Sequence, residues 1–273
     1  MPTEGERHRF RYTESVPHPQ GDVSFMRVKT ARSVWRTWQS VFAIRVHPWL
    51  SRLLQNRLAS PCGSRYPRVA MPNIMSPSFG GAALVEARKL MHALDHEPAH
   101  VEQVTRIALG IFDALSPFTE GGGSERLILE VASLLHDIGW SESEDGKRHH
   151  KISARLILEH PWQALPPEAA LRAACVARYH RRAAPRPNHK LYSTLSPKGQ
   201  KQVGILSGIL RIADGLDRTH LQRVRRVTLT RGDLGVHLGV EGSVNLRAEI
   251  QGALRKADVF EEAFGGRLEI EQA

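Results

Sequence analysis

Histidines and aspartates recur at five points in the C-terminal two thirds of the chain. Imidazole nitrogens and carboxylate oxygens are ligands for divalent metals, and a mixed set with open positions suits Mn, Fe, Co, Ni or Mg better than a closed structural zinc site. Such a site acidifies water and polarises phosphoryl oxygens. The five points are His100, the adjacent His136 and Asp137, the adjacent His149 and His150, His180, and Asp214.

The adjacent His136 and Asp137 restrict where an ion can lie. Neighbouring residues of a helix point about 100° apart around its axis, so both side chains reach one ion only near the end of the helix. Gly139 follows two residues later and predicts that end. Because a single helical histidine is more often a hydrogen-bonded core or surface residue, the prediction of a metal site depends on the whole set.

The segments that carry these residues have helical periodicity. Apolar residues at spacings of three and four follow one another from residue 82 onward, and Ser124 is a predicted N-cap after three glycines. The predicted helices cover residues 83–97, 100–117, 121–140, 150–160, 166–180 and 200–220.

The composition changes after residue 220. Alternating apolar residues around Gly-Asp predict a β-hairpin over 223–242, helical periodicity returns over 245–265, and 266–271 is a predicted strand. We therefore expect a mainly α protein with three parts: a basic, poorly ordered extension over 1–80, a helical domain over 81–221, and a small α+β subdomain over 222–273.

Four short motifs occur in an order that resembles a known superfamily. "LLHDIG", "HHKISARLI", "ARYHRRA" and "RIADGLDRTH" are similar to the HD-domain superfamily of metal-dependent phosphohydrolases. More narrowly, residues 82–271 resemble the C-terminal domain of the exopolyphosphatase / guanosine pentaphosphate phosphatase family. The resemblance implies an HD-type helical bundle that carries one or two divalent metal ions per site.

The resemblance also assigns roles to individual residues. It implies that His100, His136, Asp137 and Asp214 hold the principal metal, and that His150 and His180 hold a second ion or contact phosphate. His150 fits the position ahead of "SARLI" better than His149 does, and Ile152 stands where relatives often have a further histidine. The catalytic candidates are Asp137, His150 and His180.

Basic residues next to these motifs are candidates for binding phosphate. Arginine can grip phosphate oxygens with a planar fork, and lysine attracts them as a point charge. The candidates are Arg181, Arg182, Lys190 and Arg218, and the simpler alternative is a solvated loop face with a helix-surface ion pair. Asp217 lies next to Arg218 and is a candidate for orienting Asp214 or a substrate.

The function predicted from the resemblance is that of a stand-alone metal-dependent phosphohydrolase. Full-length members of the family carry two actin-like domains that hold their phosphatase site, and only about 80 unrelated residues precede the similar region here. The expected substrate is a phosphomonoester or phosphoanhydride: a nucleotide, a guanosine polyphosphate or polyphosphate. The alternative is a non-catalytic module that binds polyphosphate or assembles with other domains.

Charge and cysteine content limit the other function classes. The 273 residues contain 38 Lys+Arg and 28 Asp+Glu, a formal charge of +10, but residues 1–70 hold 12 basic and 4 acidic side chains. The rest carries only 26 − 24 = +2, so nucleic-acid binding by the folded body is not favoured. Two distant cysteines and the lack of a long apolar run predict a cytoplasmic protein without a membrane span. The resemblance allows for a homodimer.

Overall fold

The computed structural model describes residues 77–115, 122–232 and 235–273 of the chain. The predicted basic extension over 1–80 lies almost entirely outside these residues. All of the described residues fall within one compact unit.

Helices build the larger part of the described structure. They are α3 (Pro77–Leu94), α4 (Pro98–Leu115), α5 (Gly123–Leu135), the 3₁₀ helix η2 (Ile138–Glu142), α6 (His149–Glu159), α7 (Pro167–Arg178), the 3₁₀ helix η3 (Tyr192–Thr194) and α8 (Pro197–Leu216). Helix α5 packs against α3, α4 and α7, and every residue from Leu127 to Leu135 is buried. A helix that is buried on all sides forms the centre of a core.

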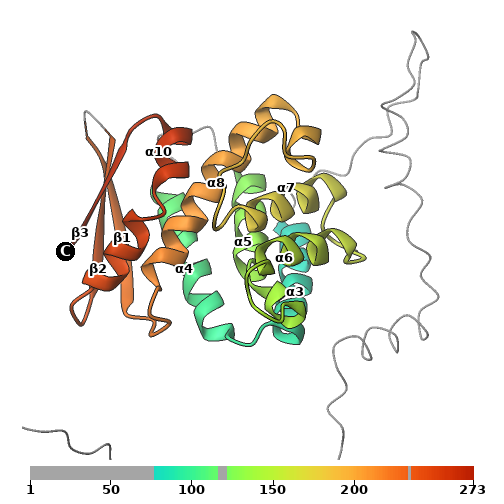
Figure 1. Ribbon diagram of the computed structural model, residues 1–273, viewed down its shortest axis with the longest axis horizontal. Helices are drawn as coiled ribbons and strands as arrows, with labels where there is room; N and C mark the ends of the chain where they lie inside the picture. Colours follow the sequence, from blue (N-terminus) through green and yellow to red (C-terminus); the bar gives the residue numbers. More distant parts are fainter. Residues whose placement is uncertain (1–76, 116–121, 233–234) are drawn as a thin grey trace, which may run out of the picture. The chain divides into compact units, whose positions relative to one another are not determined.

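Helix α8 lies between α5 and α7 on one side and the C-terminal helix α10 on the other (Figure 1). It packs against α4 and α7, and also against α9 (Arg247–Leu254) and α10 (Asp258–Phe264). Glycines allow the close approach: a Cβ at Gly208 would lie 2.6 Å from the Phe260 backbone, and a Cβ at Gly215 would lie 2.5 Å from the Ala253 Cα. The absence of side chains here lets α9 and α10 rest directly on α8.

Three strands form a small sheet in the order β1-β2-β3. Strands β1 (Val224–Arg231) and β2 (Gly235–Gly242) are antiparallel, whereas β3 (Arg267–Gln272) joins β2 in parallel. Val236, Leu238 and Val240 alternate with more exposed positions along β2, so one face of the sheet is apolar. Strand β1 packs on α4, and β3 packs on α9 and α10.

The predicted fold class, mainly α with a small C-terminal α+β part, is confirmed. No helix among the described residues is long and apolar enough to cross a membrane. The division at residues 80 and 221 stays a prediction.

Three local predictions are wrong. The single helix expected over 245–265 is two helices separated at residues 255–257. Gly122, not Ser124, is the N-cap of α5. Gly139 lies inside η2, where a Cβ would be 2.2 Å from the His149 carbonyl oxygen. Its role is therefore to admit the start of α6 rather than to end α5.

Candidate metal centre

The predicted ligands come from five elements whose ends converge in the helical core. His100 lies in the first turn of α4, His136 and Asp137 follow α5, and His180 follows α7 closely. Asp214 lies in the last turn of α8. All three histidines named here are buried, and Asp137 and Asp214 are nearly so, with side-chain exposures of 15% and 14%.

The first group of potential ligands consists of His100, His136 and Asp137. One donor atom from each lies within 4.8 Å of the others, and the Asp214 Oδ1 atom is 3.6 Å from the His100 Nε2 atom. The Nε2 atoms of His100 and His136 are buried and have no hydrogen-bond partner among the described residues. A buried nitrogen without a partner is costly, and a bound cation would remove that cost.

The other ring nitrogen of each histidine is already engaged. The Nδ1 atom of His136 lies 2.7 Å from the carbonyl oxygen of Ser133, and the Nδ1 atom of His100 lies 2.8 Å from the Asp217 Oδ2 atom. When the Nδ1–H group of a neutral imidazole donates a hydrogen bond to such an acceptor, the lone pair of the Nε2 atom is free to bind a metal. The residues present therefore fit a divalent ion, as the sequence predicts.

A second group shares Asp137 with the first. It contains Asp137, His149 and His180. The Nε2 atoms of His149 and His180 lie 3.1 and 3.5 Å from the Asp137 Oδ1 atom. Their Nδ1 atoms lie 2.7 Å from the carbonyl oxygens of Gly146 and Ala177. Because the Asp137 Oδ2 atom faces His136 instead, one carboxylate serves both groups.

His149 takes the place that the sequence assigns to His150. The preference for His150 is revised, because its buried imidazole stands edge-on to His149 and His180 and its Nδ1 atom has no partner among the described residues. Burial, followed by the charges of His149 and Arg181, lowers the pKa of His150 to about 4. His150 therefore stays neutral near pH 7, beside the ligand groups rather than within them. Ile152 packs against the apolar core.

The charges around Asp137 and Asp214 stabilise their ionised forms. Burial alone would raise the pKa of Asp137, but the charge of His136 and the hydrogen bond from His149 hold it well below its ordinary value. Burial likewise opposes ionisation of Asp214, yet Lys256 and His100 keep its pKa well below the ordinary range. Both carboxylates are anionic and ready to bind a cation.

Burial and neighbouring carboxylates act in opposite directions on the histidines. Burial lowers the pKa of His180 well below its ordinary value, so its imidazole is neutral. Burial also disfavours the charged form of His100, but Asp214 and Asp217 outweigh it and raise the pKa to about 10. A neutral His180 is suited to metal ligation, and the lowered pKa values of His150 and His180 make both poor proton donors near pH 7.

Only some of the predicted phosphate-binding residues reach these groups. The Arg181 Nη1 atom lies 3.2 Å from the His149 Nε2 atom. Arg182 and Lys190 have exposed side chains in the loop after His180. Arg218 is exposed and its aliphatic portion lies against Gly252 of α9. Asp217 orients His100 and not Asp214.

Sequence reasoning missed several neighbours of the centre. Lys256, from the break between α9 and α10, is hydrogen-bonded to the Asp214 Oδ2 atom. His220 stacks on His100 with ring centroids 3.8 Å apart. Burial raises the pKa of the Asp95 carboxyl group, which also interacts electrostatically with His136, Asp137 and His100. Nothing in the local sequence marks Lys256 as a neighbour of Asp214.

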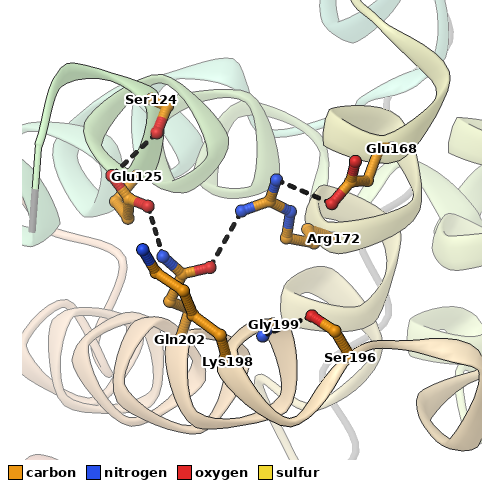
Figure 2. Close-up of a pocket in the computed structure, with 8 residues that line it drawn as sticks. All are labelled: Ser124, Glu125, Glu168, Arg172, Ser196, Lys198, Gly199 and Gln202. Atoms are coloured by element: carbon orange, nitrogen blue, oxygen red, sulfur yellow. Dashed lines mark hydrogen bonds and ion pairs between the residues drawn. The ribbon is translucent and has the colours of Figure 1, made fainter.

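A separate hollow of about 240 Å³ lies between the N-terminal ends of α5 and α8 and helix α7. Figure 2 shows that its polar side chains bond to one another: Arg172 bridges Glu168 and Gln202, and Gln202 continues to Glu125. Since Glu125, Glu168 and Arg172 are hydrogen-bonded within this hollow and it contains none of the metal-binding residues, we assign it no functional role.

Comparison with known proteins agrees with this geometry. A family model described as "Ppx/GppA phosphatase, domain III" matches residues 85–247, which include all residues of both ligand groups. No curated protein matches the chain significantly.

Proposed function

The chain belongs to the Ppx/GppA phosphatase, domain III, family, and from that premise we propose that it is a metal-dependent phosphohydrolase. The proposed substrate is a phosphomonoester or phosphoanhydride, such as a nucleotide, a guanosine polyphosphate or a short polyphosphate. The observation that carries the proposal is the pair of ligand groups joined by Asp137, with the Nε2 atoms of His100 and His136 buried and without partners among the described residues.

We infer the two ligand sets from this geometry. His100, His136, Asp137 and Asp214 would hold one ion, and Asp137, His149 and His180 would hold a second. When bound, divalent ions such as Mn, Mg, Fe, Co or Ni supply Lewis acidity toward a phosphoryl oxygen and acidify a water molecule. The closeness of the two groups suits a paired site that stabilises both the attacking and the leaving oxygen.

The protein's own side chains would bind and orient the phosphate. Arg181 lies against His149 at the edge of the second ligand group and can donate two hydrogen bonds to phosphate oxygens. Lys151 and Arg178 add positive charge close to His150, which lowers the energy of an anion in this region. Arg182 and Lys190 would attract more distant phosphates.

A phosphatase panel tests this proposal. We expect full-length protein with Mn²⁺ or Mg²⁺ to hydrolyse at least one of the nucleotides, guanosine polyphosphates and short polyphosphates. Asp137→Ala should lower that activity by more than about 100-fold, because it removes a ligand from both groups. Asp145→Ala, in the exposed loop before α6, is the matched control. Equal activity of wild type and Asp137→Ala would contradict the proposal.

The basic surface favours a second candidate, a module that binds polyphosphate without turning it over. Burial, followed by the positive charges of Arg178, Arg186 and Lys151, lowers the pKa of His189, so three basic side chains gather around this histidine. This candidate predicts bound metal, no hydrolysis, and a polyphosphate affinity that falls steeply with salt. It also predicts that Asp137→Ala leaves polyphosphate binding unchanged.

We further propose a cytoplasmic location. Cys175 is buried, and burial raises the pKa of its thiol to about 12, so it is an inert reduced side chain.

The homodimer and the absence of nucleic-acid binding also remain proposals. Gel filtration coupled to light scattering checks the first, and RNA affinity before and after deletion of residues 1–70 checks the second.

A further inference from the structure

Trp140 places an exposed indole next to the metal centre. It is 44% exposed and is the one aromatic residue among the large hydrophobic side chains exposed in the described parts of the chain. It lies in η2, three residues after Asp137. An exposed tryptophan ring is a large apolar surface with a polar edge, which is characteristic of binding sites.

One face of this ring is already covered. The Trp140 and His149 rings stack with centroids 4.6 Å apart and planes inclined by 22°. Gly146 also lies against the six-membered part of the indole, where a Cβ would come within 2.1 Å of two ring carbons. Because 44% of the Trp140 residue remains exposed, part of the indole is open to solvent.

The covered face connects the indole to the second ligand group. The His149 Nε2 atom that lies 3.1 Å from the Asp137 Oδ1 atom belongs to the same imidazole on which Trp140 stacks. The guanidinium of Arg181, a side chain that commonly binds phosphate, also contacts this imidazole. The indole and Arg181 thus both contact the imidazole of His149, so an aromatic surface and a phosphate-binding side chain lie beside the same ligand group.

We propose that Trp140 is a specificity-determining residue on which the base of a nucleotide stacks while its phosphate lies at the metal centre. This inference rests on the proposed function and deepens it, since Trp140 would favour phosphates that carry a base over phosphates without one. Aromatic side chains accept any base because every base has a π-face, so the preference is for nucleotides as a class. A base-free polyphosphate has no apolar surface with which to cover the indole.

Binding of two ligands that differ only in the base tests the inference. The probes are AMP and ribose 5-phosphate, titrated calorimetrically into full-length Mn²⁺-loaded protein and again into metal-free protein. We expect wild type to bind AMP more tightly than ribose 5-phosphate. Trp140→Leu should weaken AMP binding by about 5- to 100-fold and leave ribose 5-phosphate within about twofold. Trp140→Phe, which retains a smaller ring, should recover part of the AMP affinity.

Trp162→Leu is the matched control, because Trp162 packs on His160 after α6 rather than on a ligand histidine. It should change neither affinity. Equal weakening of both ligands in Trp140→Leu would overturn the inference, since it would show that the indole only supports His149. Unchanged AMP affinity, or no AMP binding by wild type, would overturn it as well. AMP binding that depends on Trp140 without any hydrolysis would reject the proposed function and leave this inference standing.

Discussion

Four histidines of the centre share one hydrogen-bonding pattern. In His136, His149 and His180 the Nδ1 atom faces a backbone carbonyl oxygen, and in His100 it faces the Asp217 carboxylate. The pattern leaves every Nε2 atom directed toward Asp137 or its neighbours. Because each ring is held at its far nitrogen, the proposed ligands are preorganised and a cation would meet a nearly formed site.

Asp217 is the residue whose influence on the metal is easiest to isolate. Asp217→Asn keeps the size of the side chain but removes the charge that orients and polarises His100. We expect metal affinity to fall by about 10- to 100-fold. Competition with a chelating dye measures it, and Asp113→Asn, at an exposed carboxylate, is the control. Unchanged affinity in Asp217→Asn would exclude a role in orienting His100.

Proton release on metal binding follows from the raised pKa of His100. In the metal-free protein this imidazole stays protonated up to a pKa of about 10, whereas a ligand must be neutral. Metal binding at pH 7 should therefore release at least one proton, and apparent affinity should rise with pH, by up to about tenfold per unit. Calorimetric titration of Mn²⁺ in buffers with different ionisation enthalpies counts the protons. An affinity independent of pH between about 6.5 and 9 would contradict the assignment.

At the scale of elements, the junction between η2 and α6 sets the second ligand group. The Gly139 amide donates to the Ser153 hydroxyl at 2.9 Å, and this contact holds the first turn of α6 against the residues after Asp137. His149 begins α6, so the position of this turn decides whether its imidazole reaches Asp137.

Gly139→Ala tests that arrangement. The added methyl would lie 2.2 Å from the His149 carbonyl oxygen and 2.6 Å from the Ser153 nitrogen, so α6 must move. We expect a loss of about 1 to 3 kcal/mol in the free energy of unfolding and a weakened second metal site. Gly81→Ala in α3 has no atom within 4 Å and should stabilise by about 0.5 to 1 kcal/mol. Denaturant unfolding and metal stoichiometry measure both, and normal stoichiometry in Gly139→Ala would exclude the proposed coupling.

At the scale of the whole described structure, Arg211 connects the metal centre to the C-terminal elements. It is a buried residue of α8 that donates to the carbonyl oxygens of Tyr179, Arg182 and Lys256 and pairs with Asp258 at 2.8 Å. One guanidinium thus joins the segment that carries His180 to the segment that carries Lys256. The C-terminal α+β part is therefore connected to the candidate site through Arg211.

Arg211→Met should be among the most destabilising single changes in the described structure. It leaves three carbonyl oxygens without a donor, and we expect a loss of more than about 2 kcal/mol in the free energy of unfolding. Metal affinity should fall in the same variant because Tyr179 and Lys256 lose their common anchor. Arg226→Met, at an exposed pair in the sheet, should change stability by less than about 0.5 kcal/mol. Similar stabilities of the two variants in urea would contradict this role.

Much of the fold could be predicted from sequence because its signals are local. Apolar spacing predicted the helices, and alternation predicted the hairpin and the last strand. The break at residues 255–257 was missed, since "ALRKADVFEE" continues a helical pattern and the break is held by Arg211 from a distant part of the chain.

The amino-acid sequence alone determined the family and was enough to predict the principal ligands, because the order and types of His100, His136, Asp137 and Asp214 are properties of the chain itself. Only the tertiary structure decided between His149 and His150. Adjacent helical residues point about 100° apart, and packing alone chooses which one faces inward. The same holds for Asp217, Lys256 and Trp140, whose positions beside the centre depend on how distant elements pack.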